Sequence, residues 1–587
     1  MLRLFKNFKK KDFIYVLICI ILMVFQVWIE LRLPEYMSKI TMLIETDGSS
    51  FNEIIHQGIF MLICAFGSMV SAMTIGYFAS RLSANFSLRL RESLFKKVQK
   101  LCTAEIKQFS TSSLITRTTN DVTQIEMLIA MGLQAMIKAP IMAVWAISKI
   151  VNKSTNLSLI VGAGVLVLLT IIIIIMVRVV PKFSKIQKFT DSVNSVTREN
   201  LMGIRVIRAF NAEKFQSDRF ESVNNDLTKT SLFIQKTFAL MSPFMNLIMH
   251  FLTLGIYFVG AYLINSLGMV GKVNLFSNMV VFSSYGMQVI MSFLMLTLIF
   301  MILPRAQVSA KRINEVMDAD ISIKDGKFGL SKRVENGTVE FRDVSFKYPD
   351  ADEYLLKNIS FKVNKGETIA FIGSTGSGKS TLVNLIPRFY DVTDGSILVD
   401  GVDVRNYKLD ALHNLIGYVS QKAVMFTGTV ASNIRFGTNN AAEINDEKIK
   451  DALKVSEAFD FVSLMEYGID AHIARGGTNV SGGQKQRLSI ARAVARNPEI
   501  YIFDDTFSAL DYKTDLKLRQ NLKKYTKDAT ILVVAQRIGT VLNADKIVVL
   551  DNGECVGMGT HKELLKSCEV YRQIALSQVS KEELENA

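Results

Sequence analysis

The sequence predicts a multidomain chain, in which an all-α domain with six transmembrane helices precedes an α/β domain of the P-loop nucleotide-binding type. Three observations predict this order. Hydrophobic residues make up 49% of the 587 residues, and the apolar runs of membrane length all lie in the first half. Methionine follows the same division, since 22 of the 26 Met precede Pro304. From Gly337 onward, short β-branched runs alternate with Gly and Asp turns and with helical segments, which is typical of an α/β domain.

Six apolar segments have the roughly 20-residue length that a membrane-spanning helix needs. They lie near 13–33, 58–80, 127–149, 157–177, 237–266 and 275–303. The basic N-terminus runs into the first segment without a small-residue cleavage site, so we expect an uncleaved helix rather than a signal peptide. We therefore expect a transmembrane domain at 1–304, a linker with a short amphipathic helix at 305–335, and a nucleotide-binding domain at 336–587.

The placement of charge orients the predicted helices. Residues 81–126 carry eight Lys or Arg and residues 178–236 carry eleven, whereas residues 34–57 carry one Lys and four acidic residues. The positive-inside rule places both basic segments and both termini in the cytoplasm. The net charge of +14 lies beside apolar runs, which favours a lipid bilayer and disfavours nucleic acid as the partner. The five Cys have no paired spacing, so no zinc site or disulfide framework is indicated.

Lys138 lies inside the third apolar segment. A charge at membrane depth costs a few kcal/mol and usually faces a cavity or a partner. Two interpretations remain open: Lys138 is a cation in a substrate cavity, or it snorkels or forms an ion pair. Glu30 and Arg32, near the end of the first segment, are expected at the membrane interface. The Met-rich spans are typical of lipid-facing or core packing, although flexible thioethers also suit a cavity that accepts many shapes.

The stretch TIAFIGSTGSGKSTLVNLI contains the strongest local motif of the chain. A β-run at Thr368–Ile372 leads into Gly373-x-x-x-x-Gly378-Lys379-Ser380 and then a helix. The glycines allow successive backbone N–H groups to turn toward a phosphate, and the helix N-terminus adds partial positive charge. Lys379 is expected on the β- and γ-phosphates and Ser380 on Mg²⁺. The predicted ATP-binding residues of this loop are Gly373, Ser374, Thr375, Gly376, Ser377, Gly378, Lys379, Ser380 and Thr381.

Two further stretches extend the predicted site. Ile500–Asp505 reads as a buried apolar strand that delivers Asp504 to the metal ion. Ser481, Gly482, Gly483 and Gln484 precede a clearly helical stretch, and they form a second helix start suited to a phosphate. Two phosphate-binding helix starts in one chain indicate that one of them serves a neighbouring chain.

These motifs closely resemble those of the ATP-binding cassette family in its exporter-type architecture, and the resemblance covers nearly the whole chain. It implies that two nucleotide-binding domains meet head to tail, with each ATP between one phosphate loop and the other domain's signature sequence. It further implies that Tyr348 stacks on adenine and that Gln421 joins Ser380 and Asp504 at Mg²⁺. The resemblance also assigns the signature to Val480–Gln484. It assigns the inter-domain loop to Ser508–Asp511, where Ser508 and Asp511 are the expected functional residues. Coupling helices are expected near Thr111–Ser113 and Ala209–Lys214.

Two positions depart from the family pattern. Asp505 stands where a catalytic Glu is expected, and Gln536 stands where a switch His is expected. Ala474 also replaces an acidic residue that is common in the cross-domain loop. Asp505 has a shorter side chain than Glu, and Gln536 lacks the positive charge that a His can carry. Both catalytic positions are therefore predicted to be degenerate, in a site that binds ATP and hydrolyses it poorly.

The intact signature and the degenerate catalytic pair together predict one half of a heterodimeric, multidrug-type exporter. Its partner is expected to be a non-identical half with Glu and His in place. A homodimeric lipid or peptide exporter is the alternative, and a nucleotide-gated regulator without transport is a third. The family resemblance implies that the substrates are amphipathic small molecules (drugs, lipids or peptides) and that the chain is a multi-pass protein of a bacterial cell membrane. The substrate itself does not follow from the sequence.

Overall fold

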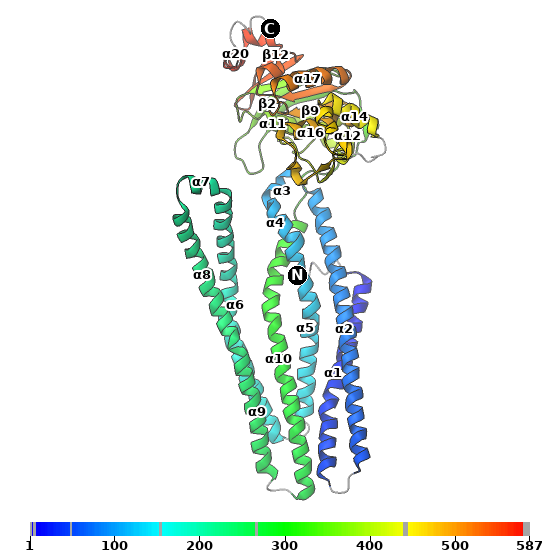
Figure 1. Ribbon diagram of the computed structural model, residues 1–587, viewed down its shortest axis with the longest axis vertical. Coiled ribbons are helices and arrows are strands. Elements are labelled where there is room, and N and C mark those ends of the chain that lie inside the picture. The colour runs from blue at the N-terminus through cyan, green and yellow to red at the C-terminus, as the bar shows by residue number, and fades with distance from the viewer. Residues whose placement is uncertain are drawn as a thin grey trace. The chain divides into compact units, whose positions relative to one another are not determined.

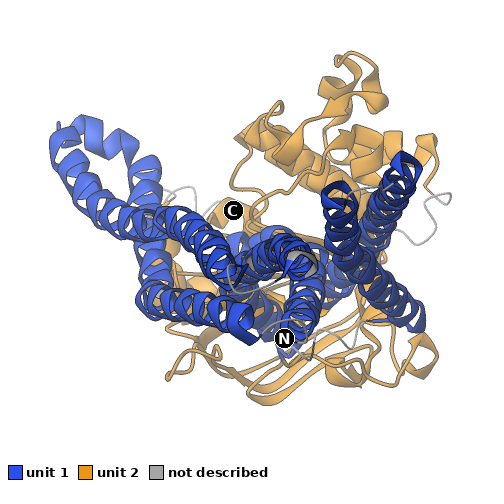
Figure 2. Cartoon of the chain, turned by 90° about the horizontal axis from the view of Figure 1, so that it is seen from below, with its two compact units in different colours: residues 1–99, 110–319 blue, residues 100–109, 320–587 orange. Residues whose placement is uncertain are grey.

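The computed structural model describes residue 3 and residues 8–46, 50–151, 155–264, 268–437 and 444–578. The chain forms two compact units (Figure 2). The first comprises Met1–Gln99 and Ser110–Ala319, and the second comprises Lys100–Phe109 and Asp320–Ala587. Residues 152–154 and 265–267, which lie between predicted membrane segments, most of the basic N-terminus and residues 579–587 lie outside the described residues.

The first unit is entirely helical over its described residues (Figure 1). Its described helices are α1 (Lys10–Glu45), α2 (Phe51–Lys100), α4 (Thr111–Thr116), a π-helical turn (Arg117–Asp121), α5 (Val122–Val151), α6 (Thr155–Met202), α7 (Ile204–Ala209), α8 (Glu213–Ala239), α9 (Met241–Ile264) and α10 (Met269–Met317). In this part of the chain six helical stretches are long and apolar enough to cross a membrane, as predicted. They run for 36 to 52 residues, whereas a bilayer needs about 20. The excess length indicates that they continue beyond the hydrocarbon core.

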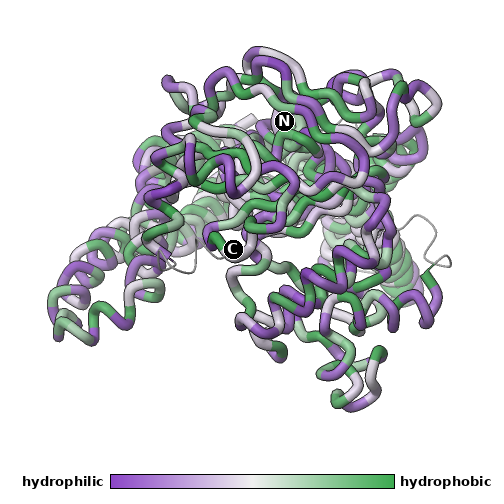
Figure 3. The backbone as a smooth tube through the Cα atoms, turned by 90° about the horizontal axis from the view of Figure 1, so that it is seen from above, coloured by the Kyte–Doolittle hydropathy of each residue, from purple (hydrophilic) through white to green (hydrophobic). Residues whose placement is uncertain are grey.

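The two long basic segments are extensions of these helices. α6 and α8 pair along their length and are joined by the short α7, whose turn ends near Asn211 with a left-handed φ of 49° (Figure 1). Polar and apolar residues are interleaved along this hairpin (Figure 3). The expected coupling segment at Ala209–Lys214 therefore lies at the α7–α8 turn, and that at Thr111–Ser113 forms the first turn of α4.

The second unit contains three β-sheets. Its strands are β1 (Val339–Phe346), β2 (Leu356–Val363), β3 (Thr368–Gly373), β4 (Asp394–Val399), β5 (Val402–Asp403), β6 (Ile416–Val419), β7 (Gly428–Thr429), β8 (His472–Ile473), β9 (Ile500–Asp504), β10 (Thr530–Val534), β11 (Lys546–Asp551) and β12 (Glu554–Gly559). A six-stranded sheet has the order β12-β11-β3-β10-β9-β6, and all its neighbouring strands are parallel except β11 and β12. A four-stranded antiparallel sheet has the order β2-β1-β4-β5, and β7 pairs with β8.

Helices and short turns connect these strands. The helices are α3 (Thr103–Phe109), α11 (Lys379–Leu385), α12 (Leu409–Leu415), α13 (Val430–Ile434), α14 (Asp446–Val455), α15 (Phe459–Ser463), α16 (Gly482–Ala495), α17 (Tyr512–Tyr525), α18 (Ile538–Val541), α19 (His561–Ser567) and α20 (Glu569–Leu576). Among the described residues, 3₁₀ turns span Leu330–Lys332, Val404–Asn406, Gly468–Asp470 and Arg475–Gly477. The predicted α/β class is confirmed.

Both faces of the six-stranded sheet are buried. Side chains alternate along each strand, so Ile500 and Ile502 of β9 enter one apolar core while Tyr501 and Phe503 enter the other. A parallel sheet covered on both faces needs continuous apolar strands, which is why IYIF reads as a run without alternation. The carboxyl ends of β3, β9 and β10 meet at one edge, where the chain places its polar residues.

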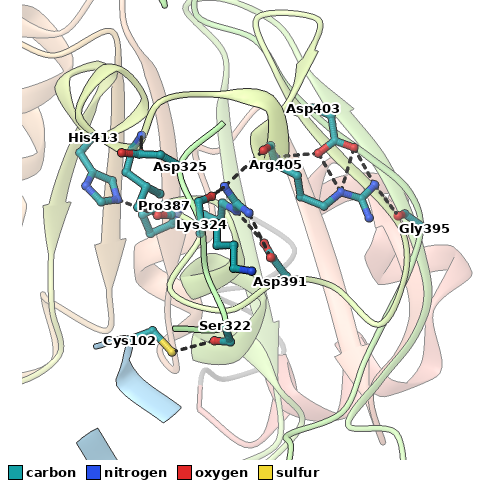
Figure 4. Close-up of polar contacts among 12 residues, drawn as sticks. Cys102, Ser322, Lys324, Asp325, Pro387, Asp391, Gly395, Asp403, Arg405 and His413 are labelled. Atoms are coloured by element: carbon teal, nitrogen blue, oxygen red, sulfur yellow. Dashed lines mark hydrogen bonds and ion pairs between the residues drawn. The ribbon is translucent and has the colours of Figure 1, made fainter. Parts of the chain in front are cut away.

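Two segments outside the sheets are attached to the second unit (Figure 4). Directly before α3, the Cys102 thiol lies 3.1 Å from the Ser322 hydroxyl. Arg388 donates to the Lys324 carbonyl at 2.9 Å, and it also forms a two-bond ion pair with Asp391 at 2.7 and 3.1 Å. The region after α10 is thus pinned to the second unit from residue 320 onward. The boundaries at 304/305 and 335/336 remain a prediction.

Candidate nucleotide-binding site

The phosphate loop joins β3 to α11 and has the backbone that its glycines allow. Gly376 and Gly378 have φ of 88° and 93°, in the left-handed region that L-residues with side chains rarely adopt. At Gly378 an added Cβ would also lie 2.6 Å from the Leu356 side chain. These glycines permit a tight turn that leads directly into the N-terminus of α11. Such a turn presents backbone N–H groups to an anion.

Lys379 folds back over this loop. Its Nζ donates to the carbonyls of Gly373 at 2.8 Å and Ser374 at 2.7 Å, and it lies 3.4 Å from the Ser377 hydroxyl. Burial lowers the pKa of Lys379 below its usual range, and the carboxylates of Asp505 and Asp504 act in the opposite direction. A buried ammonium held by carbonyls at the mouth of an N–H-lined loop is suited to bind phosphate.

Asp504 ends β9 beside the first turn of α11. The Ser380 hydroxyl donates to Asp504 Oδ1 at 2.6 Å. Burial raises the pKa of Asp504 and the neighbouring Asp505 adds to this, while the Ser380 hydrogen bond and Lys379 lower it. A cation would relieve the cost of burying this carboxylate. The hydroxyl and the carboxylate are both oxygen donors of the kind Mg²⁺ prefers, so these residues fit the predicted ion.

The Asp505 side chain accepts two hydrogen bonds, whereas the Asp504 side chain accepts one. Asp505 Oδ2 accepts the Gln536 amide at 2.8 Å and the Gln421 amide at 3.2 Å. The Asp505 backbone has a φ of 45°, a conformation that Asp tolerates better than most residues. The structure thus brings together both departures from the family pattern, Asp505 and Gln536. It places Gln421 on Asp505, whereas the resemblance implies a position at Mg²⁺.

Gln536 is itself held by the end of the chain. The Gln578 side-chain amide donates to the Gln536 carbonyl at 2.8 Å and accepts from the Ile538 backbone N–H at 2.9 Å. Gln578 follows α20, so the C-terminal helix fixes the turn that presents Gln536. Sequence reasoning missed this contact, because the residues are 42 positions apart and no motif joins them.

Tyr348 lies close to the phosphate loop. Its hydroxyl is 2.9 Å from the Thr381 hydroxyl, and its ring meets Tyr390 edge-on at 5.3 Å between centroids. Lys107 of α3 lies 5.4 Å from the centre of the same ring. The aromatic residue predicted to stack on adenine is therefore beside the loop, and α3 contributes a cation that the motifs did not indicate.

The signature residues form a well-capped helix start. The Ser481 hydroxyl accepts from the Gln484 backbone N–H at 3.3 Å, while the Gln484 side chain accepts from the Ser481 backbone N–H at 2.8 Å. This reciprocal capping box fixes the first turn of α16. The Gly482 position has open space where a Cβ would be, and Gly483 lies near the Ala509 carbonyl. The backbone N–H groups of this turn are available for an anion from outside the chain.

The inter-domain loop connects the site to α17. The Ser508 hydroxyl donates to the Asp505 carbonyl at 2.8 Å, and Arg537 donates to the Ser508 carbonyl at 3.2 Å. Asp511 caps α17 by accepting the Thr514 backbone N–H at 3.0 Å, and this hydrogen bond lowers the pKa of Asp511. The Ser508 side chain therefore ties this loop to the backbone of Asp505.

In the membrane unit, Lys138 has a specific partner. Its Nζ lies 3.0 Å from Oε1 of Glu30 on α1. Glu30 lies 20 residues into α1, which continues to Glu45. The expected position of Glu30 at the membrane interface remains a prediction. The ion-pair interpretation of Lys138 agrees with this geometry, and its role toward a substrate remains a prediction.

The comparisons with known proteins agree with the fold. The family model described as "ABC transporter" matches residues 356–508, and "ABC transporter transmembrane region" matches residues 16–302. The chain is 39% identical over 520 residues to an ABC transporter ATP-binding protein of Mycobacterium tuberculosis, covering 88% of this chain and 87% of that protein. It is 35% identical to YfiB of Bacillus subtilis over 96% of both chains. The chain belongs to the ABC transporter family.

More specifically, the chain is a half-transporter of the exporter type, with one transmembrane domain and one nucleotide-binding domain. It is 31% identical to the ATP-dependent lipid A-core flippase of Photobacterium profundum, covering 85% of this chain and 84% of that protein. The fold matches the solved structure of a bacterial Atm1-family ABC exporter with ATP bound, with a TM-score of 0.79 at 22% identity over 98% of this chain and 100% of that one. The chain is thus a multi-pass membrane protein and an ATPase coupled to transport.

Proposed function

We propose that this chain is the slowly hydrolysing half of a heterodimeric, ATP-driven exporter of amphipathic small molecules. The observation that carries the proposal is the state of Asp505. Both Gln536 and Gln421 donate to the same carboxylate oxygen, at 2.8 and 3.2 Å. An acid in this position must accept a proton from water, and a carboxylate oxygen that already accepts two N–H groups is a weaker base.

The length of the side chain weakens the site further. Asp places its carboxylate about 1–1.5 Å short of the position that Glu reaches, and misplacement on that scale can cost ~10²-fold in rate. Gln536 donates a hydrogen bond but carries no positive charge for the developing phosphoryl transition state. Both losses affect hydrolysis at the same site.

The parts expected to bind ATP are intact. Lys379 and the loop N–H groups would hold the phosphates, Tyr348 would meet the adenine, and Ser380 with Asp504 would hold Mg²⁺. Bound Mg²⁺ supplies charge neutralisation between phosphate oxygens. Gln421 would join this group by leaving Asp505. The site is therefore expected to retain ATP and to release phosphate slowly.

The signature turn supports a role in trans. Its capping box fixes Ser481 and leaves the first-turn N–H groups of α16 for a ligand from another chain. ABC exporters work as dimers, so this turn would complete the partner's site, where a Glu and a His are expected. A chain with a weakened catalytic pair, Asp505 and Gln536, and an ordered signature suits a heterodimer in which only the partner-based site hydrolyses ATP rapidly.

The charge distribution of the membrane unit supports an orientation, and the similarity to known proteins supports a substrate class. The positive-inside rule supports a cytoplasmic location for the basic α2–α5 and α6–α8 connections, and with them both termini, in a bacterial cell membrane. Similarity to proteins described as lipid A-core flippases favours a lipid-like amphipath. The second candidate is a homodimeric lipid exporter, whose substrate class the same similarity favours.

One experiment separates the two candidates. The tagged chain is recovered from its native membrane in mild detergent, and the accompanying proteins are identified and quantified by mass spectrometry. A second exporter half at one-to-one stoichiometry, with Glu and His at the positions matching Asp505 and Gln536, is the expected result. Recovery of this chain alone as a dimer, with brisk substrate-stimulated ATPase, would overturn the heterodimer and leave the homodimer.

A further inference from the structure

Four helices of the membrane unit meet at a polar cluster, which we call the Glu30 cluster: Gln26 and Glu30 of α1, Ser68 of α2, Lys138 of α5 and Gln288 of α10. Glu30 Oε1 accepts from the Gln26 amide at 2.9 Å, from the Ser68 hydroxyl at 3.0 Å and from Lys138 Nζ at 3.0 Å. All four helices belong to candidate membrane spans. Charged residues at such positions are costly and usually serve a function.

Several hydrogen-bonding atoms of the Glu30 cluster have no partner among the described residues. Glu30 Oε1 carries three donors, whereas Oε2 has no partner among the residues that the structure describes. Lys138 has three N–H donors and, within the described ranges, uses one of them, on Glu30. The Gln288 amide donates to the Glu30 carbonyl at 3.4 Å, while its Oε1 is buried and unpartnered. Two acceptors and two N–H donors are left open at one place.

The neighbouring ion pair shows what a completed pair looks like in this unit. Glu35 Oε2 accepts from Arg32 at 3.0 Å, and Glu35 Oε1 accepts from Lys149 at 2.8 Å and from the Tyr285 hydroxyl at 3.4 Å. Both oxygens of Glu35 are therefore used. A pair whose only task is to hold helices together can be satisfied in this way, and the Glu30 cluster is not.

The cluster is also reachable from outside the chain. The side chains of Glu30 and Lys138 are 21% and 22% exposed. Met131 is 61% exposed and lies seven residues before Lys138 on the same face of α5, and Met291 of α10 is exposed three residues after Gln288. Flexible thioethers beside an open polar cluster suit an apolar chain attached to a polar head group.

We propose that the Glu30 cluster binds the head group of a zwitterionic amphipath that carries a primary ammonium and an anionic group. The ammonium donates to Glu30 Oε2 and Gln288 Oε1, and the anion accepts from Lys138. A head group without net charge matches a site whose own two charges cancel. This inference rests on the proposed export function, for which it names a substrate class.

The test measures binding without nucleotide, so that it does not depend on hydrolysis. The chain, together with any half-transporter that accompanies it, is placed in nanodiscs and titrated while tryptophan fluorescence is recorded. Trp28 and Trp145, the only two Trp of this chain, flank Glu30 and Lys138 on α1 and α5. The probes are lysophosphatidylethanolamine and lysophosphatidylcholine with the same acyl chain, and trileucine as a water-soluble zwitterion.

The ethanolamine lipid is expected to bind about tenfold more tightly than the choline lipid, because a quaternary ammonium has no N–H to donate to Glu30 and Gln288. In the variant E30Q/K138M this preference should fall to within about twofold. That variant replaces an ion pair with two neutral side chains of similar length, so no charge is left unpaired. The control E35Q/K149M removes the neighbouring Glu35–Lys149 pair and also the carboxylate partner of Arg32; it should keep the preference.

Equal affinity for the two lysolipids in the unmodified chain, or a preference that survives in E30Q/K138M, would overturn the inference. Binding of trileucine in place of the lysolipid, with the same loss in E30Q/K138M, would support it and assign a peptide source. Selective binding without ATP-driven transport would overturn the proposed function alone. Transport of other amphipaths without this selectivity would overturn the present inference alone.

Discussion

If Asp505 and Gln536 limit hydrolysis, as the proposed function states, replacing them by Glu and His should turn a slow site into a fast one. In the variant D505E/Q536H the longer carboxylate reaches toward the attacking water, and a side chain that can carry positive charge stands beside the γ-phosphate. The change also removes the Gln536 amide that donates to Asp505 at 2.8 Å. Hydrolysis at this chain's own site is the quantity expected to rise.

The magnitude follows from the geometry. Moving the carboxylate by about 1–1.5 Å is worth ~10²-fold in rate, which corresponds to about 2.7 kcal/mol in the activation free energy. The left-handed backbone at residue 505, with φ of 45°, opposes the change, since Glu tolerates it less well than Asp. That strain of about 1–2 kcal/mol reduces folding stability rather than the rate of the chemical step.

The assay is single-turnover hydrolysis of radiolabelled ATP by the purified complex in excess over nucleotide. The unmodified complex should release phosphate in a fast phase from the partner-based site and a slow phase from this site. In D505E/Q536H the slow phase should accelerate by ~10²-fold, because the Glu carboxylate reaches farther toward the attacking water than the Asp carboxylate does. The single variants D505E and Q536H separate the two contributions, which need not be additive because the residues touch.

Two results would refute the reasoning. A slow phase that is unchanged in D505E/Q536H, with ATP binding and thermal stability retained, would show that these two residues do not limit hydrolysis. A single fast phase in the unmodified complex would show that no slow site exists. The variant D505N, which keeps the size of the side chain and loses the carboxylate, controls for any general effect of substitution and should slow the phase further.

Three other predictions concern binding and stability. Replacing Ser481 by Ala should lower the ATPase activity of the complex at least about tenfold, through the partner-based site. The change removes a helix-capping group worth ~1 kcal/mol and a hydroxyl that would contact the partner's ATP. A fluorescent ATP analogue should still bind this chain's own phosphate loop. Replacing Lys379 by Ala should weaken that analogue by ~10²-fold at the own site, since charge-assisted hydrogen bonds to phosphate disappear. His561, buried against the Tyr571 hydroxyl, has a pKa lowered by burial, so the folded state binds fewer protons than the unfolded state just below pH 6.5. Thermal stability of the second unit should therefore fall as pH drops from 7.5 to 5.5, and less so in H561Q.

The local parts of the fold were predictable because their signals are local. A strand, a glycine loop and a helix are adjacent in sequence at Thr368–Leu385, and an apolar run of membrane length is recognisable from composition alone. The same holds for the signature turn, whose cap and glycines are consecutive. Such features depend on neighbours within one helical turn or one strand.

The remaining contacts depend on packing between distant segments. Glu30 and Lys138 are 108 residues apart, and α1 and α5 must pack in one register before the pair forms. Gln578 reaches the Gln536 carbonyl only because α20 packs beside the sheet. α3 lies between two helices of the first unit in sequence but belongs to the second unit in space, where Lys107 meets Tyr348. Periodicity and motifs carry no information about such pairings.

The distribution of changes at the nucleotide site has a consequence for how the complex would work. On the proposed function, the departures from the family pattern affect the activation of water, at Asp505 and Gln536, whereas the groups expected to hold phosphate and metal keep that pattern. Binding without turnover keeps a site occupied, and a ligand at 100 times its dissociation constant stabilises the state that binds it by about 2.7 kcal/mol. An ATP retained between this phosphate loop and the partner's signature would hold the two nucleotide-binding domains together while the other site hydrolyses. Each transport cycle would then need only one site to open, and speeding up hydrolysis in D505E/Q536H should loosen the dimer between cycles as well as raise the rate.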